Sequence, residues 1–561
     1  MCQNCKSQFQ IELEDFDFYK KTETPPPTFC PQCRFQRRLA FWNLLNLYRR
    51  PCDLCKKDGI SMYRPELPHK VYCPRCWWSD DWDPLEYGRE YDFSRPFFEQ
   101  INDLWHKVPL LGISIDKETL ATSPYTNHCG HLKNCYLVFH ADYNEDCSYG
   151  VVVFHSKSIL DCSLITLSEL CYDSMHSFKN SRCIGVNHTI ESIDCLFTKD
   201  SANCQSCFAS ANLRNKKYHI FNKPHTKEEY LREIGKWDLG SYRQYQEVKR
   251  LAEEHWKNFA PKPRHDEMSQ DISGNYVFES KNCKECFEVT GAQDCKYLFL
   301  VGGPPVRDCY DVSGWGNNMS LSYEGCIIGE YASNLKFCQE AGLNLYNADY
   351  SKLSTGGSNH FGCVSVKKGD FCILNKRYSE EEYKKLREKI IKHMNEMPYK
   401  DRKGRTYAYG EFFPVEVSPF AYNETVANDL FPLSKAEALK ERYSWAEPET
   451  RAYSTTKQAA DLPDHIKDAS DDLLKEVVAC EMCGKGFKII SMELDFLRKM
   501  NLPLPRQCPF CRINGKFRKW IKNLRIFKRN CSTCGTEFEC SYPQEEVAKI
   551  LCKKCYLDEV V

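Results

Sequence analysis

The central part of the chain carries small and apolar residues at every third position. Between Cys129 and Ser210, all cysteines are separated by multiples of three: 129, 135, 147, 162, 171, 183, 195, 204 and 207. Uncharged residues occupy the rest of this register, and the charged residues fall outside it. A period of three matches neither an α-helix (3.6) nor a flat strand (2.0). It predicts a narrow β-solenoid in which each short side directs one residue inward and two outward.

The commonest cysteine spacings, nine and twelve residues, indicate coils of about a dozen residues with four inward positions. A wider three-sided coil of roughly 18–24 residues is the alternative. Asn or Asp precedes many inward cysteines, which predicts corners in the left-handed region, since these residues tolerate it. The examples are Asn134, Asp146, Asp161, Asp194 and Asn203.

A second stretch repeats the pattern with phase breaks. Its cysteines fall into three registers: 283, 286 and 295; 326 and 338; and 309, 363 and 372. Insertions at 302–308 and 314–320 are expected to loop out between coils. Both stretches end alike, with matches at Ile220/Ile373, Asn222/Asn375, Lys223/Lys376 and Tyr230/Tyr383. Thr226-x-x-Glu229 and Ser379-x-x-Glu382 are capping boxes, so a helix that covers the solenoid end is predicted after each stretch.

The mid-chain thiols admit three roles: metal ligands, disulfides or core packing. We favour unreactive buried thiols, because the same register accepts Ser, Val and Ala. A catalytic thiol would need a nearby base, for which His128, His131, His140 and His155 are candidates. The aromatic-rich segment 77–111 is a platform for a carbohydrate or peptide, or it packs the N-terminal module onto the first solenoid coil, which we favour. Segment 401–425 is expected to play the same part at the other end.

Eight Cys-x-x-Cys pairs, four near each end, form a repeated pattern. In both sets 24 residues separate the first pair from the second and 17 separate the third from the fourth. The middle gap is 18 residues in one set and 19 in the other. Arg34 matches Arg512 and Trp42 matches Trp520 in the same register. These agreements indicate an internal duplication.

Two such pairs complete a tetrahedral sulfur shell, which favours Zn²⁺ over iron, disulfides or free thiols in a reducing compartment. A closed shell of four thiolates leaves no open position, so four structural zinc ions are predicted. The ligands are Cys2, Cys5, Cys30, Cys33, Cys52, Cys55, Cys73, Cys76, Cys480, Cys483, Cys508, Cys511, Cys531, Cys534, Cys552 and Cys555. Cys540 has no partner at matching spacing.

The segment 480–512, with CxxCGxxF, an acidic-aromatic stretch and P-x-x-CPxCR, resembles the treble-clef "probable zinc-ribbon" domain family. Residues 1–34 are similar but lack the Gly after Cys5. The chain as a whole resembles long zinc-ribbon proteins of ultrasmall bacteria, with supporting segments at 76–100 and 410–425. The resemblance implies a bound metal but no particular activity. In a treble clef the second Cys pair opens a helix, so helices are expected after Cys33 and Cys511.

Both expected helices are basic. Residues 34–50 contain five Arg and no acid, and residues 506–530 contain nine Lys/Arg and no acid. Cations mixed with aromatics suit phosphate contact and base stacking, although a solvated helix face is the alternative. If the second segment is helical throughout, its cations share one face and form a candidate nucleic-acid site. Those residues are Arg518, Lys522, Arg525 and Arg529.

Composition limits the function classes. The chain has 561 residues, 34 of them Cys, and 77 Lys+Arg balance 77 Asp+Glu. Zero net charge excludes a uniformly cationic nucleic-acid coat. The start has no signal-peptide pattern and no apolar run would span a bilayer, so a cytoplasmic protein with reduced thiols and no membrane partner is expected.

The expected fold class is mainly β: a central narrow β-solenoid in two stretches with capping helices, flanked by duplicated double zinc-ribbon/treble-clef modules. The divisions are 1–76 (zinc module), 77–125 (aromatic segment), 126–223 (first solenoid stretch), 224–270 (helical cap and linker), 271–376 (second stretch), 377–445 (cap helix and packing segment), 446–475 (linker) and 476–561 (zinc module). The expected function is non-enzymatic binding, with RNA, DNA, a ribonucleoprotein or a protein as partner. The alternatives are a purely protein–protein scaffold and an enzyme on the solenoid flank, which would need Asp142, Glu145 and Asp146 to converge with basic residues.

Overall fold

The computed structural model describes residues 1–447 and 454–560. Residues 448–453, part of the expected linker 446–475, lie outside the described residues. The chain forms two compact units. Unit 1 contains Met1–Ile113, Arg264–Glu447 and Leu524–Ile526, whereas unit 2 contains Ser114–Pro263 and the described residues of Pro448–Asn523 and Phe527–Val561. Each unit thus combines one solenoid stretch with the cysteine-rich module from one end of the chain.

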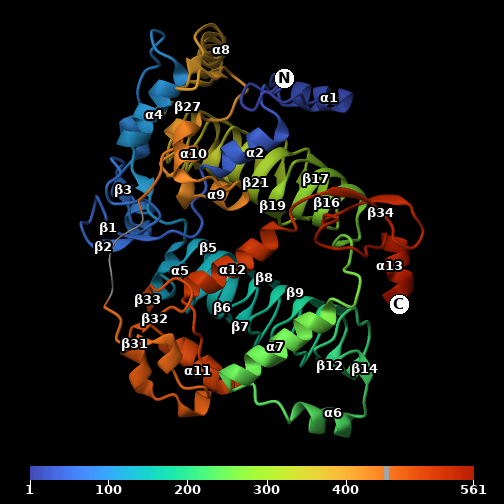
Figure 1. Cartoon of the computed structure of the whole chain (residues 1–561). Coiled ribbons are helices and arrows are strands. Elements are labelled where there is room, and N and C mark those ends of the chain that lie inside the picture. The colour runs from blue at the N-terminus through green and yellow to red at the C-terminus, as the bar shows by residue number, and fades with distance from the viewer. Residues whose placement is uncertain (448–453, 561) are drawn as a thin grey trace. The chain divides into compact units, whose positions relative to one another are not determined.

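The first stretch, in unit 2, is a solenoid of twelve-residue coils (Figure 1). Asn127 pairs with Phe139, and Asn187 pairs with Lys199, in parallel rungs. The mainly β fold with a narrow solenoid is therefore confirmed, and the wider coil is wrong for this stretch. Its strands are β5 (Asn127–Lys133), β6 (Tyr136–Phe154), β7 (Lys157–Leu160), β8 (Ser163–Thr166), β9 (Met175–Phe178), β10 (Asn187–Ile190), β11 (Lys199–Ala202), β12 (Gln205–Phe208) and β13 (Lys217–Ile220).

The backbone explains the period of three. The residue before each inward position is left-handed, for example Asn134 (φ 52°), Asp161 (φ 55°) and Asn203 (φ 53°). Each side of the coil is therefore one inward residue, one outward residue and one left-handed corner. The corners expected at Asn and Asp are confirmed. Bulky residues such as Val152 (φ 60°) adopt the same conformation, so the surrounding ladder imposes it against local preference.

Inward thiols and hydroxyls make the same hydrogen bond, which explains their interchange. Cys147 Sγ donates to the carbonyl of Glu145 at 3.2 Å, and Ser156 Oγ donates to the carbonyl of Phe154 at 2.9 Å. In both cases the acceptor lies two residues earlier. Every cysteine of the two stretches is buried as a free thiol. Burial raises the pKa of the Cys162 thiol well above its ordinary value, as expected for an unreactive group.

We expect native alkylation under reducing conditions to leave Cys162, Cys171, Cys183 and Cys195 unlabelled, because each is 0% exposed. Mass spectrometry of iodoacetamide-treated native protein measures this directly. The same protein unfolded in urea should label at all four positions, which controls for digestion and detection. Rapid labelling of these four cysteines in the native protein would contradict the prediction that they point into the solenoid.

The second stretch, in unit 1, has coils of unequal length. The step between rungs is 12 residues from Asn282 to Asp294 and 13 residues from Asn334 to Asn347, which confirms the phase breaks. Glycines stack where rungs approach: a Cβ on Gly329 would lie 1.9 Å from the carbonyl oxygen of Gly316. The strands are β15 (Asp266–Glu267), β16 (Gln270–Phe278), β17 (Lys281–Thr290), β18 (Ala292–Lys296), β19 (Phe299–Gly302), β20 (Val306–Arg307), β21 (Tyr310–Gly316), β22 (Met319–Ser320), β23 (Tyr323–Gly329), β24 (Ala332–Lys336), β25 (Gln339–Asp349), β26 (Thr355–Phe361) and β27 (Asp370–Ile373).

Both stretches end in a short antiparallel return followed by a capped helix. β14 (Lys223–Pro224) and β28 (Lys376–Arg377) form the returns, and α6 (Lys227–Ile234) and α8 (Glu380–Glu396) begin with the expected capping boxes. Asn222 and Asn375 close the last coils. The Asn375 amide donates to the carbonyl of Val364 at 2.8 Å and accepts from its N–H at 2.7 Å. In unit 2, α5 (Lys117–Thr122) contacts β5 at the start of the solenoid, and α7 (Tyr242–Trp256) contacts the rungs through Tyr245 and Lys249 (Figure 1).

The aromatic segment packs on a different stretch from the one expected. Phe97, at the start of α4 (Phe97–Lys107), lies 5.1 Å from Tyr350 and 5.4 Å from Phe361 between ring centroids. Both partners belong to the second solenoid stretch of unit 1, whereas the sequence predicted packing onto the first coil. Phe413, from the expected packing segment 401–425, joins this cluster and lies 4.8 Å from Trp105. The sequence could not show which stretch the segment covers, since either offers an apolar outer side.

Short elements complete the two units. In unit 1 they are α1 (Leu13–Lys21), α2 (Pro31–Leu39), β1 (Tyr48–Pro51), β2 (Asp58–Ser61), β3 (Val71–Tyr72), α3 (Pro74–Trp77), η1 (Pro84–Tyr87), β4 (Leu110–Leu111), β29 (Tyr399–Lys400), β30 (Thr406–Tyr407), η2 (Val415–Val417), η3 (Tyr422–Glu424), α9 (Val426–Leu430) and α10 (Lys435–Lys440). In unit 2 they are β31 (Lys457–Gln458), η4 (Ala459–Asp461), η5 (Ile466–Asp468), η6 (Asp471–Leu474), β32 (Val478–Ala479), β33 (Gly486–Phe487), α11 (Ser491–Met500), α12 (Pro509–Ile521), β34 (Phe527–Asn530), β35 (Glu537–Cys540) and α13 (Lys553–Val560).

Candidate metal centres and the basic helices

Four groups of four cysteines converge, each with its sulfur atoms within 4.8 Å of one another. They are the groups predicted: Cys2/Cys5/Cys30/Cys33, Cys52/Cys55/Cys73/Cys76, Cys480/Cys483/Cys508/Cys511 and Cys531/Cys534/Cys552/Cys555. The Sγ atoms of Cys5 and Cys30 lie 3.7 Å apart, and those of Cys483 and Cys508 lie 3.8 Å apart. Four sulfurs at about 2.3 Å from a tetrahedral Zn²⁺ would be separated by ~3.8 Å. The donor set and its spacing therefore fit a structural zinc ion.

The first pair of each group sits on the same tight turn. Lys6 N–H donates to the carbonyl of Cys2 at 3.1 Å, and Gly484 N–H donates to that of Cys480 at 2.9 Å. The residue after the second cysteine is left-handed in all four turns, namely Lys6, Lys56, Gly484 and Gly535. In the N-terminal turns Lys therefore adopts a left-handed conformation, which Gly adopts without steric cost in the C-terminal turns. The missing Gly after Cys5 does not change the turn.

The second pair of each group opens a helix, as predicted from the resemblance to treble-clef domains. Cys30, Cys73 and Cys508 are the N-caps of α2, α3 and α12, each followed by Pro at the first helical position. Cys552 directly precedes α13. Helix N-termini place N–H groups and the positive end of the dipole beside the thiolates, which favours the charged form that binds metal.

Backbone and side-chain donors support the sulfur atoms. Cys508 N–H donates to Cys480 Sγ at 3.2 Å, and the Asn4 amide donates to Cys33 Sγ at 3.3 Å. The Ser7 hydroxyl lowers the pKa of the Cys5 thiol to about 6, whereas burial and the neighbouring thiols raise the pKa of Cys33. Packing four thiols together opposes their full ionisation, and a bound dication would remove that opposition. Cys540 stays outside the groups and donates to the carbonyl of Tyr542 at 3.3 Å.

The three arginines of α2 are buried in unit 1. Arg34, Arg37 and Arg38 are 2%, 2% and 0% exposed. Arg34 and Arg38 pair with Asp311 at 2.8 and 2.9 Å. Arg37 pairs with Glu324 at 2.7 Å and with Glu411 at 2.9 Å. These three guanidinium groups lock α2 onto the second solenoid and are not available to phosphates in this fold.

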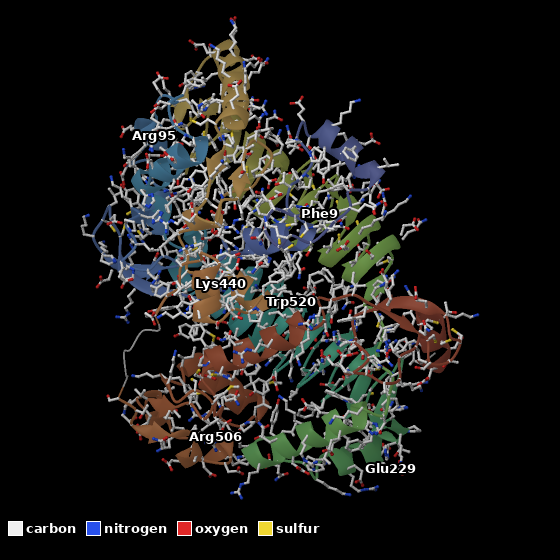
Figure 2. The ribbon with its side chains drawn as sticks, turned by 45° about the horizontal axis from the view of Figure 1, so that its top comes forward. Phe9, Arg95, Glu229, Lys440, Arg506 and Trp520 are labelled. Atoms are coloured by element: carbon white, nitrogen blue, oxygen red, sulfur yellow. The ribbon has the colours of Figure 1, made fainter. Side chains whose placement is uncertain are left out.

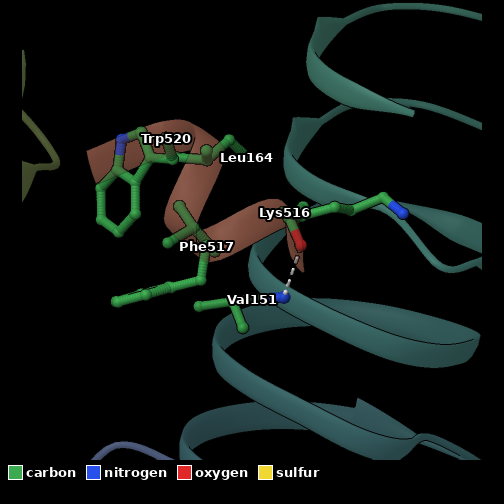
Figure 3. Close-up of a pocket in the computed structure, with 7 residues that line it drawn as sticks. Val151, Leu164, Lys516, Phe517 and Trp520 are labelled. Carbon is green, nitrogen blue, oxygen red and sulfur yellow. Dashed lines mark hydrogen bonds between the residues drawn. The ribbon is translucent and has the colours of Figure 1, made fainter. Parts of the chain in front are cut away.

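The matching residues of α12 make the equivalent lock in unit 2. Arg512, which aligns with Arg34, pairs with Glu493 at 2.8 Å and with Asp161. Lys516, one helical turn later, pairs with Asp173 at 2.6 Å. Figure 3 shows Phe517 and Trp520 beside Val151 and Leu164 of the solenoid, and Trp520, also marked in Figure 2, is 1% exposed. Trp520 therefore packs against the solenoid and does not stack on bases.

The four candidate nucleic-acid residues do not share one helical face. Helix α12 ends at Ile521, so only Arg518 lies in it, with Lys522 at its C-cap. Arg525 falls between α12 and β34, and Arg529 lies in β34. Arg518, Lys522 and Arg525 are exposed, whereas the Arg529 guanidinium donates to the carbonyls of Tyr542, Val547 and Ala548. The expectation of a continuous helix failed because a strand begins at Phe527 to form the last cysteine module.

The sequence analysis did not identify the solenoid acids that pair with the cations of α2 and α12. Asp311 and Glu324 lie on adjacent rungs, as do Asp161 and Asp173, and all four are left-handed corner residues. The available signal was a pair of acids one coil apart at the corner position of the register. The acids named for the enzyme alternative pair with residues of neighbouring rungs: Asp142 with His131, Glu145 with Lys133 and Lys157, and Asp146 with Asn134.

Comparison with known proteins adds little. No family profile matches the chain, and no curated protein matches it either. Among solved structures, one from Desulfovibrio desulfuricans G20, provisionally named an acetyltransferase, aligns with 54% of this chain and 84% of its own at 10% identity, with a TM-score of 0.10. At that score the alignment carries no argument. Within the described residues, no helix is long and apolar enough to cross a membrane.

Proposed function

We propose that the protein is a zinc-structured, non-enzymatic binding scaffold. The observation that carries this proposal is that the second cysteine pair of one group at each end of the chain opens a helix whose cations pair with acids of a solenoid. Cys33 leads into Arg34, Arg37 and Arg38, and Cys511 leads into Arg512 and Lys516. A metal closed by four thiolates has no site for substrate, so its contribution is to hold these helices in place.

Purification under reducing conditions, with metal analysis and a check for bound nucleic acid or protein, tests the scaffold proposal. Zinc together with a reproducible macromolecular partner is the expected result. A chain that folds without zinc would overturn the proposal, and so would a turnover activity lost on mutating the solenoid flank.

A nucleic acid is a second candidate partner for unit 2, supported by the exposed Arg518 and Lys522 at the end of α12. Neither residue makes an ion pair with any of the described residues. They lie four positions apart, at the spacing that places two side chains on one side of a helix. Phosphate contacts are the ordinary use of such cations.

We expect Arg518→Glu with Lys522→Glu to weaken binding of a short single-stranded RNA or DNA to the full chain. Two phosphate contacts would contribute roughly −1.5 to −2 to the slope of log K against log[salt]. Fluorescence anisotropy of a labelled oligonucleotide at several salt concentrations measures both effects. The matched control is Lys216→Glu with Lys217→Glu, two exposed lysines near the other end of the first solenoid. No binding at ~50 mM salt, or equal loss in the control, would remove nucleic acid as the partner.

A further inference from the structure

The two cysteine modules differ in what covers their first helix. In unit 2, the apolar residues Phe487, Ile489 and Leu494 are 7%, 1% and 1% exposed. Their counterparts in the register of the duplication are Phe9, Ile11 and Phe16. Phe16 is 48% exposed, and Leu13 beside it on α1 is 89% exposed. Phe9, marked in Figure 2, and Ile11 are half-buried. The same face is therefore covered in one copy and open in the other.

The segment 456–475 supplies the cover in unit 2. Its strand β31 pairs with β32 of the module, and η5 packs against α11. Leu462, Ile466 and Leu473 of this segment are 4%, 3% and 5% exposed. The segment is thus a short apolar strip held along the module.

Polar contacts fix this strip in position. The Arg498 guanidinium pairs with Asp471 at 2.7 Å and donates to the carbonyl of Ala469 at 2.8 Å. The segment is acidic, with Asp at 461, 464, 468, 471 and 472. The strip is therefore recognised by apolar contact together with Arg498 at the end of α11 and with Arg506, whose guanidinium donates to the carbonyls of Ala459, Leu462 and Pro463.

The open copy keeps one of these two cations, since Thr28 stands at the position of Arg506. Lys20 occupies the position of Arg498, is exposed, and makes no ion pair with any of the described residues. The segment around 405–411 contacts the cysteine turn and α2 of this module: Thr406 N–H donates to Gln3 at 2.8 Å, Thr28 N–H donates to Glu411 at 2.9 Å, and Glu411 also pairs with Arg37. The outer side of α1 with Leu13 and Phe16 stays exposed.

We propose that this open face of unit 1, formed by Phe9, Ile11, Leu13, Phe16 and Lys20, docks an acidic, leucine-containing segment of a partner protein. The internal duplicate shows the kind of segment that fits: a short strand followed by turns that present Leu or Ile inward and Asp toward the cation. Apolar area gives the affinity and the Lys20–carboxylate pair gives the orientation. This inference rests on the proposed function as a binding scaffold, and it names the class of partner.

The test uses a labelled synthetic peptide with the sequence of residues 456–475 and the full-length protein. Fluorescence anisotropy should show saturable binding with a Kd below about 100 μM. Phe16→Asp should weaken binding at least about tenfold, because it places a charge in the apolar contact, and Lys20→Glu should weaken it about threefold or more at low salt. Leu439→Asp, at an equally exposed leucine of α10, is the control and should bind like the parent.

Zinc content separates the two possible failures. A parent protein with intact zinc that does not bind the peptide overturns the docking site alone, whereas a parent protein that folds without zinc overturns the proposed function. Equal binding by the parent and Phe16→Asp, which would place the peptide elsewhere, also overturns the site. Dimerisation of the parent that Phe16→Asp abolishes and the peptide does not inhibit would assign the face to a second copy of this chain.

Discussion

Elemental analysis of the purified protein should return four equivalents of zinc per chain, one for each group of four cysteines. The reason is the convergence of sixteen thiols at spacings that fit a tetrahedral ion, with Sγ separations of 3.7 and 3.8 Å where neighbouring pairs meet. Each closed site can supply on the order of 10 kcal/mol of metal-coupled folding energy. Removal of zinc by a strong chelator should therefore unfold the modules, and with them the helices that begin at the second cysteine pairs.

Two double variants compare how much two of the metal sites contribute to stability. Cys30→Ser with Cys33→Ser should lose one zinc and also loosen unit 1, because α2 carries the three buried arginines. Cys552→Ser with Cys555→Ser should lose one zinc with a smaller effect, because α13 belongs to a small cluster that includes Leu551 and Tyr556. Metal content and thermal unfolding measure the two effects. Fewer than three zinc equivalents in the parent, or absorbance bands of iron, would refute the assignment.

The second large effect is expected from Arg37→Ala. Its guanidinium is held between Glu324 and Glu411 and is 2% exposed. Burial alone would lower the pKa of Arg37, but the two carboxylates raise it above its ordinary value, so the group stays charged. Truncation removes the closest cation from two buried carboxylates and leaves Glu324 with Arg34 at 3.8 Å, which should lower the free energy of unfolding of unit 1 by about 3–5 kcal/mol.

Hydrogen exchange of the α2 and β23 amides in the full chain measures this loss locally, so the two units need not unfold together. Arg49→Ala removes an exposed arginine of the same module and should change stability by less than about 0.5 kcal/mol. Arg37→Ala with Glu324→Gln should recover part of the loss, because one uncompensated charge is removed. Equal hydrogen-exchange rates in Arg37→Ala and Arg49→Ala would show that the ion pairs of Arg37 do not stabilise unit 1.

The backbone conformation of the coils could be predicted from the sequence. The register of three predicts inward Cys, Ser and Ala, and the Asn and Asp residues before them predict left-handed corners, because each coil repeats the same few backbone conformations. The capping boxes at Thr226 and Ser379 were readable for the same reason: their contacts span three residues. The four cysteine groups followed from two short turns each, repeated at the same spacing.

Only the tertiary structure decided how these parts combine. The N-terminal module packs on the second solenoid and the C-terminal module on the first, so Arg34 meets Asp311 across 277 positions and Arg512 meets Asp161 across 351. Periodicity and spacing report local backbone geometry and carry no information about such distant pairs. For that reason the basic helices suggested nucleic acid from the sequence, whereas in the structure most of their cations are buried or half-buried and stabilise the fold. Likewise, only the structure shows that Phe16 is exposed where its counterpart Leu494 is covered.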